Sequence, residues 1–324
     1  MTNAKQRLLA IVGPTAGGKT ALSIALAKAV GGEIVSCDSM QLYRGMDVGT
    51  AKPTVSEMEG IPHHMIDILD ADQSYSCADY VTDARATIQE IARAGKLPVV
   101  CGGTGLYLDS LLLGGSFEDT PSDPAVRERL QAIAEQPNGK EILYDRLAEV
   151  DPESAEAIHK NNVKRVIRAL EIYECCGTPK SVLDRASRTR GLLYDATVIG
   201  IRYHSRELLY SRIDRRVDIM LEQGLYDEVV RLRDAGVFER NATAAQAIGY
   251  KELLGVLDGT ATLSEAVDSL KQATRHYAKR QMTWFCAKPY VQWIWADTEE
   301  GLLRPFDDIL ADALTLLERG GVHE

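Results

Sequence analysis

The chain of 324 residues has few of the features that mark a membrane, secreted or metal-thiolate protein. It has no apolar run long enough to span a bilayer, and the stretch Leu8–Val12 is too short for the core of a signal peptide. Its six cysteines form no C-x-x-C pair and no zinc-type spacing with histidine, which is typical of free thiols in a reducing compartment. Lys and Arg (37) are outnumbered by Asp and Glu (47), so a surface that is basic all over is excluded. We therefore expect a cytoplasmic protein whose basic patches, if it has any, are local.

The pattern of apolar runs predicts one α/β core with an insertion. An apolar fraction of 45% allows a sizeable core. Strand and helix patterns alternate up to residue 115, and helix starts replace them from Phe117 to Gly191. Strands are predicted at Arg7–Val12, Glu33–Cys37, Leu97–Cys101, Ala196–Tyr203 and Tyr290–Trp295, and the main early helices at Lys19–Val30, Ala78–Ala94 and Thr104–Leu113. Because strands return after the helical block, we predict a parallel-sheet core of residues 1–116 and 192–324 and an all-helical insertion domain of residues 117–191.

A phosphate-binding motif lies between the first predicted strand and the first predicted helix. Gly13-Pro-Thr-Ala-Gly-Gly-Lys-Thr20 fits G-x-x-x-x-G-K-[ST], which makes the predicted fold class a P-loop NTPase-like α/β core. Backbone N–H groups of such a loop cradle phosphate oxygens, Lys19 adds a cation, and the Thr20 hydroxyl can hold Mg²⁺. A chance glycine-rich turn is disfavoured by the flanking strand and helix. The motif alone also fits a nucleotide or small-molecule kinase, with Asp38 at the end of the second strand holding the metal.

Three further blocks carry a specific resemblance. They read Ser39-Met-Gln-Leu-Tyr-Arg-Gly-Met-Asp-Val-Gly-Thr-Ala-Lys-Pro53, Gly102-Gly-Thr-Gly-Leu-Tyr107 and Thr274-Arg-His-Tyr-Ala-Lys-Arg-Gln-Met-Thr-Trp284. Together with the loop, they resemble the bacterial tRNA dimethylallyltransferases, which attach a five-carbon prenyl group to an adenine beside the anticodon. The chain departs from the family pattern at Gly17, where the family commonly carries Ser.

The resemblance implies a reaction and a set of residues for it. The N6 amine of adenine displaces diphosphate from dimethylallyl diphosphate, with Mg²⁺ as cofactor and Thr20 as its protein ligand. The implied catalytic residues are Asp38 as general base and Lys19 and Arg212 as cations facing diphosphate. The diphosphate-binding residues are expected to be Gly13, Thr15, Ala16, Gly17, Gly18, Lys19, Thr20 and Arg216. A solvated helix face remains the alternative for the pair Arg212 and Arg216.

Two basic segments are candidates for holding the anticodon stem-loop of a tRNA. Lys271–Tyr290 contains five Lys or Arg and no acid, and the insertion contributes a second group. The residues expected at the tRNA are Asp38, Ser39, Met40, Gln41, Thr104, Arg127, Lys164, Arg165, Arg168, Gln246, Gly249, Tyr250, Lys251, Lys271, Arg275 and Lys279. Gln41 is a candidate reader of the adenine edge, and Thr104 is alternatively a helix N-cap. Solvated faces, or an RNA-binding protein without catalysis, remain open alternatives, and we expect a monomer.

Overall fold

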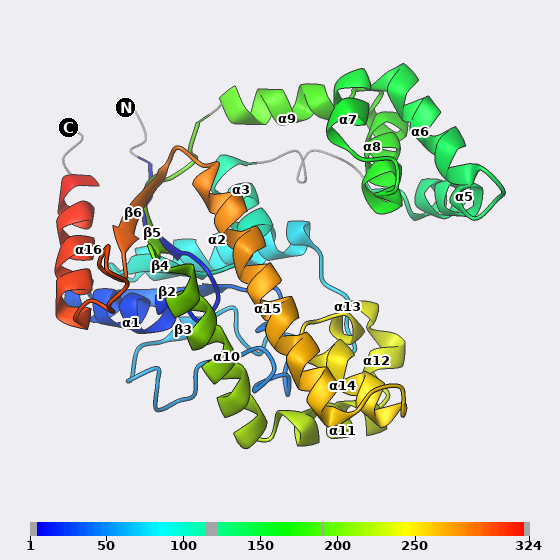
Figure 1. Ribbon diagram of the computed structural model, residues 1–324. Coiled ribbons are helices and arrows are strands. Elements are labelled where there is room, and N and C mark those ends of the chain that lie inside the picture. The colour runs from blue at the N-terminus through cyan, green and yellow to red at the C-terminus, as the bar shows by residue number, and fades with distance from the viewer. Residues whose placement is uncertain (1–4, 115–121, 190, 321–324) are drawn as a thin grey trace. The chain divides into compact units, whose positions relative to one another are not determined.

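A computed structural model describes residues 5–114, 122–189 and 191–320 of the chain (Figure 1). Its centre is a parallel sheet with the strand order β3-β2-β4-β1-β5-β6. The strands are β1 (Arg7–Val12), β2 (Gly32–Cys37), β3 (His63–His64), β4 (Leu97–Gly102), β5 (Asp195–Arg202) and β6 (Val291–Trp295). The predicted α/β fold class is confirmed, and the five predicted strands agree with the structure to within one residue at each end. The two-residue strand β3 was not predicted, because it is too short to show any periodicity.

Helices cover both faces of the sheet, which explains why its inner strands are apolar throughout. One face packs against α1 (Lys19–Val30) and α16 (Phe306–Gly320), where Leu9, Ile11 and Ile199 meet Leu26 and Ala313. The helix α2 (Cys77–Arg93) contacts β2 and β4, and its capping box at Ser76 fixes where it begins. No helix in the described ranges is long and apolar enough to cross a membrane.

The C-terminal half adds a helical layer beside the sheet. Its elements are α10 (Arg206–Glu222), α11 (Leu225–Asp234), α12 (Val237–Arg240), α13 (Ala242–Ala245), α14 (Tyr250–Leu257) and α15 (Leu263–Cys286). The long helices α10 and α15 pack on each other. A second apolar core, which includes Met46, Val217, Tyr250 and Leu270, joins these helices to the segment that follows β2. This core holds that segment against the helical layer.

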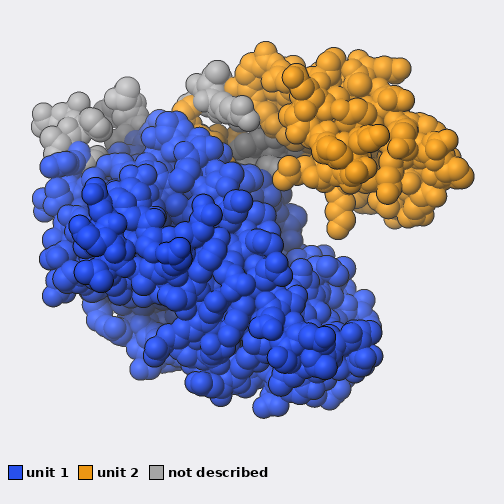
Figure 2. Space-filling view, viewed as in Figure 1, with its two compact units in different colours: residues 1–108, 194–324 blue, residues 109–193 orange. Residues whose placement is uncertain are grey.

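The chain divides into two compact units, residues 1–108 with 194–324 and residues 109–193 (Figure 2). After α3 (Gly105–Leu113), the second unit contains α5 (Pro124–Ala134), α6 (Gly139–Val150), α7 (Pro152–Ala157), α8 (Val163–Cys176) and α9 (Lys180–Thr189). The predicted helix starts at Asp123-Pro124 and Asp151-Pro152 are confirmed, since each Asp side chain accepts a hydrogen bond from the first turn. The unit has a core of its own, including Leu130, Leu143, Leu147, Val166 and Leu170. The predicted boundary Phe117 lies outside the described residues, and Gly191 lies two residues before the end of the unit.

Candidate active site

The phosphate-binding loop connects β1 to α1 at the carboxyl edge of the sheet, where parallel sheets bind ligands. Ala16 and Gly18 have positive φ values of 58° and 94°, which turn successive N–H groups toward one side. Gly13 cannot carry a side chain, because a Cβ would lie 2.8 Å from the Ile201 carbonyl oxygen on β5. The loop conformation therefore depends on glycines that the motif predicted.

Three side chains from distant elements hold this loop. Gln281 on α15 accepts the Thr15 N–H (2.8 Å), and its own amide donates to the Gly103 carbonyl (3.1 Å). Arg212 on α10 donates through Nε to the Ala16 carbonyl (3.1 Å), and the Tyr203 hydroxyl donates to that of Gly17 (3.3 Å). The loop is thus fixed before any ligand binds, which reduces the ordering cost of binding.

Lys19 is the cation of the loop. Its ammonium group donates to the Pro14 carbonyl (2.7 Å). Burial lowers its pKa to about 8, although the nearby Asp38 opposes this shift. An anion bound in the loop stabilises the charged ammonium, so Lys19 can respond strongly to a phosphate ligand.

Asp38 follows β2 directly and lies beside the loop, as predicted. Its Oδ1 accepts the Met40 N–H (2.9 Å). Burial raises the pKa of the carboxyl, while this hydrogen bond and the charge of Lys19 pull the pKa in the opposite direction. A raised pKa makes a carboxylate a stronger base, which suits a group that accepts a proton during a reaction.

Arg216 faces the site from α10 and donates to the Ala51 carbonyl (3.3 Å). Burial lowers its pKa, but a guanidinium stays charged in proteins. The segment that carries Ala51 is held by Glu228 on α11, whose carboxylate accepts the N–H groups of Asp47 (2.9 Å), Val48 (2.8 Å) and Gly49 (3.0 Å). The Tyr250 hydroxyl donates to the same carboxylate (2.7 Å). Glu228 therefore holds the segment that carries Ala51 in place at the site.

A cavity of about 260 Å³ lies between these elements. Its polar wall includes Thr15, Asp38, Arg216, Thr274, Tyr277 and Arg280, and its apolar wall includes Met40, Ile213, Val217, Met220, Ile248 and Leu270. The cavity thus joins a phosphate site, a carboxylate and an apolar space. Such a combination fits an anionic ligand with a small hydrocarbon group.

Tyr277 was not predicted, although it stands in the block Thr274–Trp284 that carried the resemblance. Its hydroxyl lies near the side chains of Thr104, Gln281 and Asp38. Burial raises its pKa, so the hydroxyl remains protonated and able to donate. Gln281 and Glu228 were missed as well, because nothing in the local sequence shows that they reach the loop and the segment after β2.

The residues after Asp38 are held by contacts that bear on their predicted roles. The Thr104 hydroxyl accepts the Ser39 N–H (3.1 Å). The Gln41 amide accepts from Ser36 and donates to the carbonyls of Thr50 and Ala51, so reading an adenine edge requires it to leave these partners. Its contact with the adenine remains a prediction.

The predicted basic stripe on α15 is divided by ion pairs. Arg275 makes two contacts with the Asp214 carboxylate (2.6 and 2.8 Å), and Lys271 contacts Asp218 (2.6 Å), both on α10. Lys279 is exposed at the other end. The sequence could not show these ion pairs, because the acids lie on a different helix. Of the three cations, Lys279 is the most exposed to solvent.

The remaining residues predicted at tRNA divide between the two units. In the core, Gln246 and Tyr250 line the cavity, Gly249 is the N-cap residue of α14, and the exposed Lys251 contacts Glu252. In the second unit, Lys164 and Arg165 on α8 are exposed. Arg127 and Arg168, in contrast, both form ion pairs with the buried Glu171. Burial raises the pKa of Glu171, but the hydrogen bonds from Arg168 and Arg127 outweigh it and lower the pKa. Arg127 and Arg168 are thus engaged in structural ion pairs, and their contact with tRNA remains a prediction.

The next question is which side chains could hold a metal. Within residues 5–114, 122–189 and 191–320, no three His, Cys, Asp or Glu side chains gather as a metal site. Thr20 at the start of α1 offers a hydroxyl beside the loop. Mg²⁺ prefers oxygen ligands and often keeps several waters and phosphate oxygens, so this one hydroxyl is compatible with a diphosphate-bound ion.

Comparisons with known proteins show which family the chain is similar to. The family described as IPP transferase matches residues 41–288, and the one described as isopentenyl transferase matches residues 6–75. The tRNA dimethylallyltransferase of Bacillus subtilis is 53% identical over 293 residues, which cover 90% of this chain and 92% of the relative. The crystal structure of the tRNA isopentenylpyrophosphate transferase of Bacillus halodurans is 44% identical, with a TM-score of 0.70 and 98% of both chains covered. A eukaryotic dimethylallyltransferase acting on tRNA is 30% identical, with a TM-score of 0.73, over 90% of this chain and 74% of the other.

Proposed function

The chain belongs to the tRNA dimethylallyltransferase family, and from this membership we propose how its site carries out the reaction. The enzyme transfers a dimethylallyl group from dimethylallyl diphosphate to the N6 amine of the adenine on the 3′ side of a tRNA anticodon and releases diphosphate. The observation that carries this assignment to the site is the cavity, where phosphate-binding groups and an apolar wall flank Asp38. The apolar wall next to the loop suits the hydrocarbon group of this donor.

The donor lies with its diphosphate on the loop and its prenyl group against the apolar wall. The diphosphate accepts hydrogen bonds from the loop N–H groups and faces Lys19, Arg212 and Arg216. The prenyl group packs against the apolar wall, which includes Val217 and Met220, and Asp38 lines the same cavity. Binding on two sides orients the allylic carbon for attack.

The transfer forms one bond and breaks one. The N6 nitrogen bonds to the allylic carbon while the bond from that carbon to oxygen breaks, and diphosphate leaves with the electron pair. The nitrogen becomes acidic as the new bond forms, and the Asp38 carboxylate takes its proton. The cations of the loop and of α10 stabilise the charge that develops on diphosphate.

We further propose that Mg²⁺ is the cofactor and that Thr20 holds it. When bound, the ion neutralises charge on the leaving diphosphate. We also propose that the enzyme acts as a monomer in the cytoplasm on the anticodon stem-loop; the free thiols at all six cysteines fit a reducing compartment.

One experiment separates this reaction from phosphoryl transfer. Purified enzyme receives tRNA, dimethylallyl diphosphate and Mg²⁺ with all nucleotides omitted, and nucleosides from the tRNA are analysed by mass spectrometry. We expect N6-prenylated adenine and diphosphate in a one-to-one ratio. A strict requirement for ATP, or release of single phosphate, would restore the kinase interpretation that the loop alone allows.

A further inference from the structure

The buried amide of Gln281 on α15 contacts two loops of the site at once. Its Oε1 accepts the Thr15 N–H in the phosphate-binding loop (2.8 Å), and its Nε2 donates to the Gly103 carbonyl in the turn after β4 (3.1 Å). The residue is only 4% exposed. Both polar ends of the side chain therefore have partners inside the protein, and the two partners belong to different loops.

Two glycines allow the turn after β4 to pack closely on both sides. A Cβ on Gly103 would overlap with Nε2 of Gln281, and a Cβ on Gly102 would overlap with the Cys37 carbonyl oxygen at the end of β2. The turn fits between α15 and β2 because these two positions carry no side chain. Gln281, the turn and the end of β2 are thus packed in a row.

The turn is bonded in its own right to the residues on either side of Asp38. The Thr104 N–H donates to the Cys37 carbonyl (3.1 Å), and the Thr104 hydroxyl accepts the Ser39 N–H (3.1 Å). Hydrogen bonds therefore lead from the phosphate-binding loop through Gln281 and the turn to both neighbours of Asp38. In the proposed reaction the loop holds the leaving group and Asp38 takes the proton, so this path joins two groups whose separation must match the reacting atoms.

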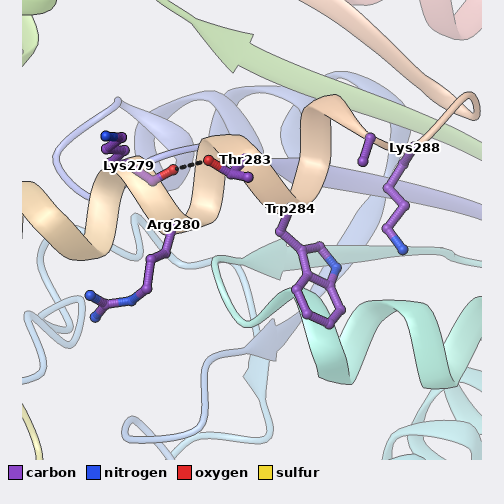
Figure 3. Close-up of a pocket in the computed structure, with 6 residues that line it drawn as sticks. Lys279, Arg280, Thr283, Trp284 and Lys288 are labelled. Atoms are coloured by element: carbon purple, nitrogen blue, oxygen red, sulfur yellow. Dashed lines mark hydrogen bonds between the residues drawn. The ribbon is translucent and has the colours of Figure 1, made fainter. Parts of the chain in front are cut away.

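Gln281 differs from its neighbours on α15, which face open space. Figure 3 shows Arg280 and Trp284 projecting from the same side of the helix, where both line a hollow. Gln281 is not among the described residues that line this hollow or the reaction cavity. A role of Gln281 in the reaction therefore has to pass through the loops that it holds.

We propose that Gln281 is a positioning residue, which sets the separation between the phosphate-binding loop and Asp38. The proposal rests on the proposed function, because it takes diphosphate to lie on the loop and Asp38 to accept the proton. A misplacement of about 1 Å can cost about 10²-fold in rate although every reacting group is still present. Loss of the Gln281 amide should therefore slow the chemical step itself, and an effect on donor binding alone is not enough.

The test replaces Gln281 by Met, which has a similar length and can make neither hydrogen bond. Single-turnover prenylation of tRNA is measured with both substrates saturating, and the affinities for donor and tRNA are measured separately. We expect Gln281→Met to slow the saturated step by about 10- to 100-fold while tRNA affinity stays near that of the wild type. Gln281→Asn covers the case in which Gln281→Met does not fold, because its amide is one methylene shorter and cannot reach both loops. The same slow step is expected for it.

Thr262→Ala is the matched control for a loss of stability in α15. The Thr262 hydroxyl caps the start of this helix by accepting the Glu265 N–H. Its removal should lower the midpoint of thermal unfolding and leave the saturated rate unchanged. This control separates a weaker helix from a displaced loop.

A double-mutant cycle shows whether the effect passes through the turn. Thr104→Val removes the acceptor of the Ser39 N–H and keeps the shape of the side chain. We expect the loss caused by the Gln281 variant to be smaller in the Thr104→Val background than in the wild type. Additive losses, or a saturated rate equal to that of the wild type in a folded Gln281 variant, overturn the proposal. A failure of the proposed function is distinct, because the wild type itself then forms no prenylated adenine.

Discussion

Asp38 is the residue that we propose as the proton acceptor. Replacing it by Asn keeps the shape and an acceptor oxygen for the Met40 N–H but removes the proton acceptor. We expect Asp38→Asn to lose at least about 10²-fold in the chemical step while donor and tRNA affinities stay near those of the wild type. Single-turnover prenylation at saturating substrates measures this step. A rate within a few-fold of the wild type would show that the proton goes elsewhere.

The two charged groups of the site set opposite limits on pH. Asp38 works as a carboxylate, so activity falls as the pH drops through its raised pKa. Lys19 works as a cation, and its pKa near 8 in the donor-free enzyme means that donor capture falls as the pH rises through about 8. We therefore expect a bell-shaped profile of kcat/KM for dimethylallyl diphosphate, because this parameter reports the free enzyme.

The variant Lys19→Arg tests whether Lys19 causes the fall of kcat/KM at alkaline pH, which is the alkaline limb of the profile. Arginine stays charged across the accessible pH range, so the limb should disappear even if the overall rate is lower. A limb near pH 8 that persists in Lys19→Arg belongs to another group.

At the scale of elements, the segment after β2 depends on a carboxylate on α11. The Glu228 carboxylate accepts four hydrogen bonds, from three backbone N–H groups and from the Tyr250 hydroxyl. In Glu228→Gln only one acceptor oxygen remains, so two of these four donors lose their partner. We expect a loss of about 1–3 kcal/mol in the free energy of unfolding for each buried group left unpaired. The KM for the donor should rise as well, because this segment carries Ala51, the acceptor of Arg216.

Tyr250→Phe is the matched control, since it removes one of the four hydrogen bonds and leaves the backbone contacts intact. Denaturant unfolding and donor KM are measured for both variants. A donor KM equal to that of the wild type in folded Glu228→Gln would limit the role of Glu228 to stability.

The two ends of the basic stripe on α15, Lys271 and Lys279, should differ in their effect on RNA binding. Lys279 is exposed, whereas Lys271 is paired with Asp218. We expect Lys279→Gln to weaken tRNA binding and to reduce the slope of log affinity against log salt by about 0.7–0.9, the value for one phosphate contact. Lys271→Gln should leave the slope unchanged. An equal reduction of the slope in both variants would show that Lys271 contacts the RNA as well, despite its ion pair with Asp218.

At this scale, the sequence could predict only those parts of the site that lie in short, continuous segments. The phosphate loop, Lys19 and Asp38 stand in short segments whose neighbours fix their conformation, and the structure has them side by side. Gln281 and Glu228 reach the same site from 266 and about 180 residues away in the chain, so no spacing rule points to them. The pairing of Arg275 with Asp214 escaped for the same reason: helix periodicity gives the face of one helix but not the charges on the helix that covers it.

At the scale of the molecule, the interruption of the strand pattern was the useful signal. Strands stop after β4 and return at β5, and β5 pairs directly with β1, so the sheet is built from both sides of the helical block. The exact ends were harder to predict, because α3 belongs in part to both units and its apolar residues continue without a break across the boundary. Composition cannot show which core a buried leucine joins.

The division into two units predicts that the core survives without the helical block. Each unit has an apolar core of its own among the described residues: Leu130, Leu147 and Leu170 belong to the core within residues 109–193, and the sheet packs on helices of the other unit. The chain also leaves and returns at one place, since the Leu193 N–H donates to the Leu112 carbonyl at 2.7 Å. A linker of a few residues can therefore replace residues 117–191 at a small entropic cost.

We expect this shortened chain to unfold cooperatively and to bind dimethylallyl diphosphate with an affinity close to that of the full chain, because every residue placed at the diphosphate remains. Its tRNA affinity should fall, since Lys164 and Arg165 are lost with the block. Denaturant unfolding, donor titration and tRNA binding are compared with the full chain, and a full-length variant carrying Lys164→Gln and Arg165→Gln serves as control. If the two exposed cations account for the contribution of the block, the control should lose a comparable factor in tRNA affinity. A shortened chain that cannot fold would show that the core needs the block for its stability, and one that binds tRNA as the full chain does would remove the block from the RNA site.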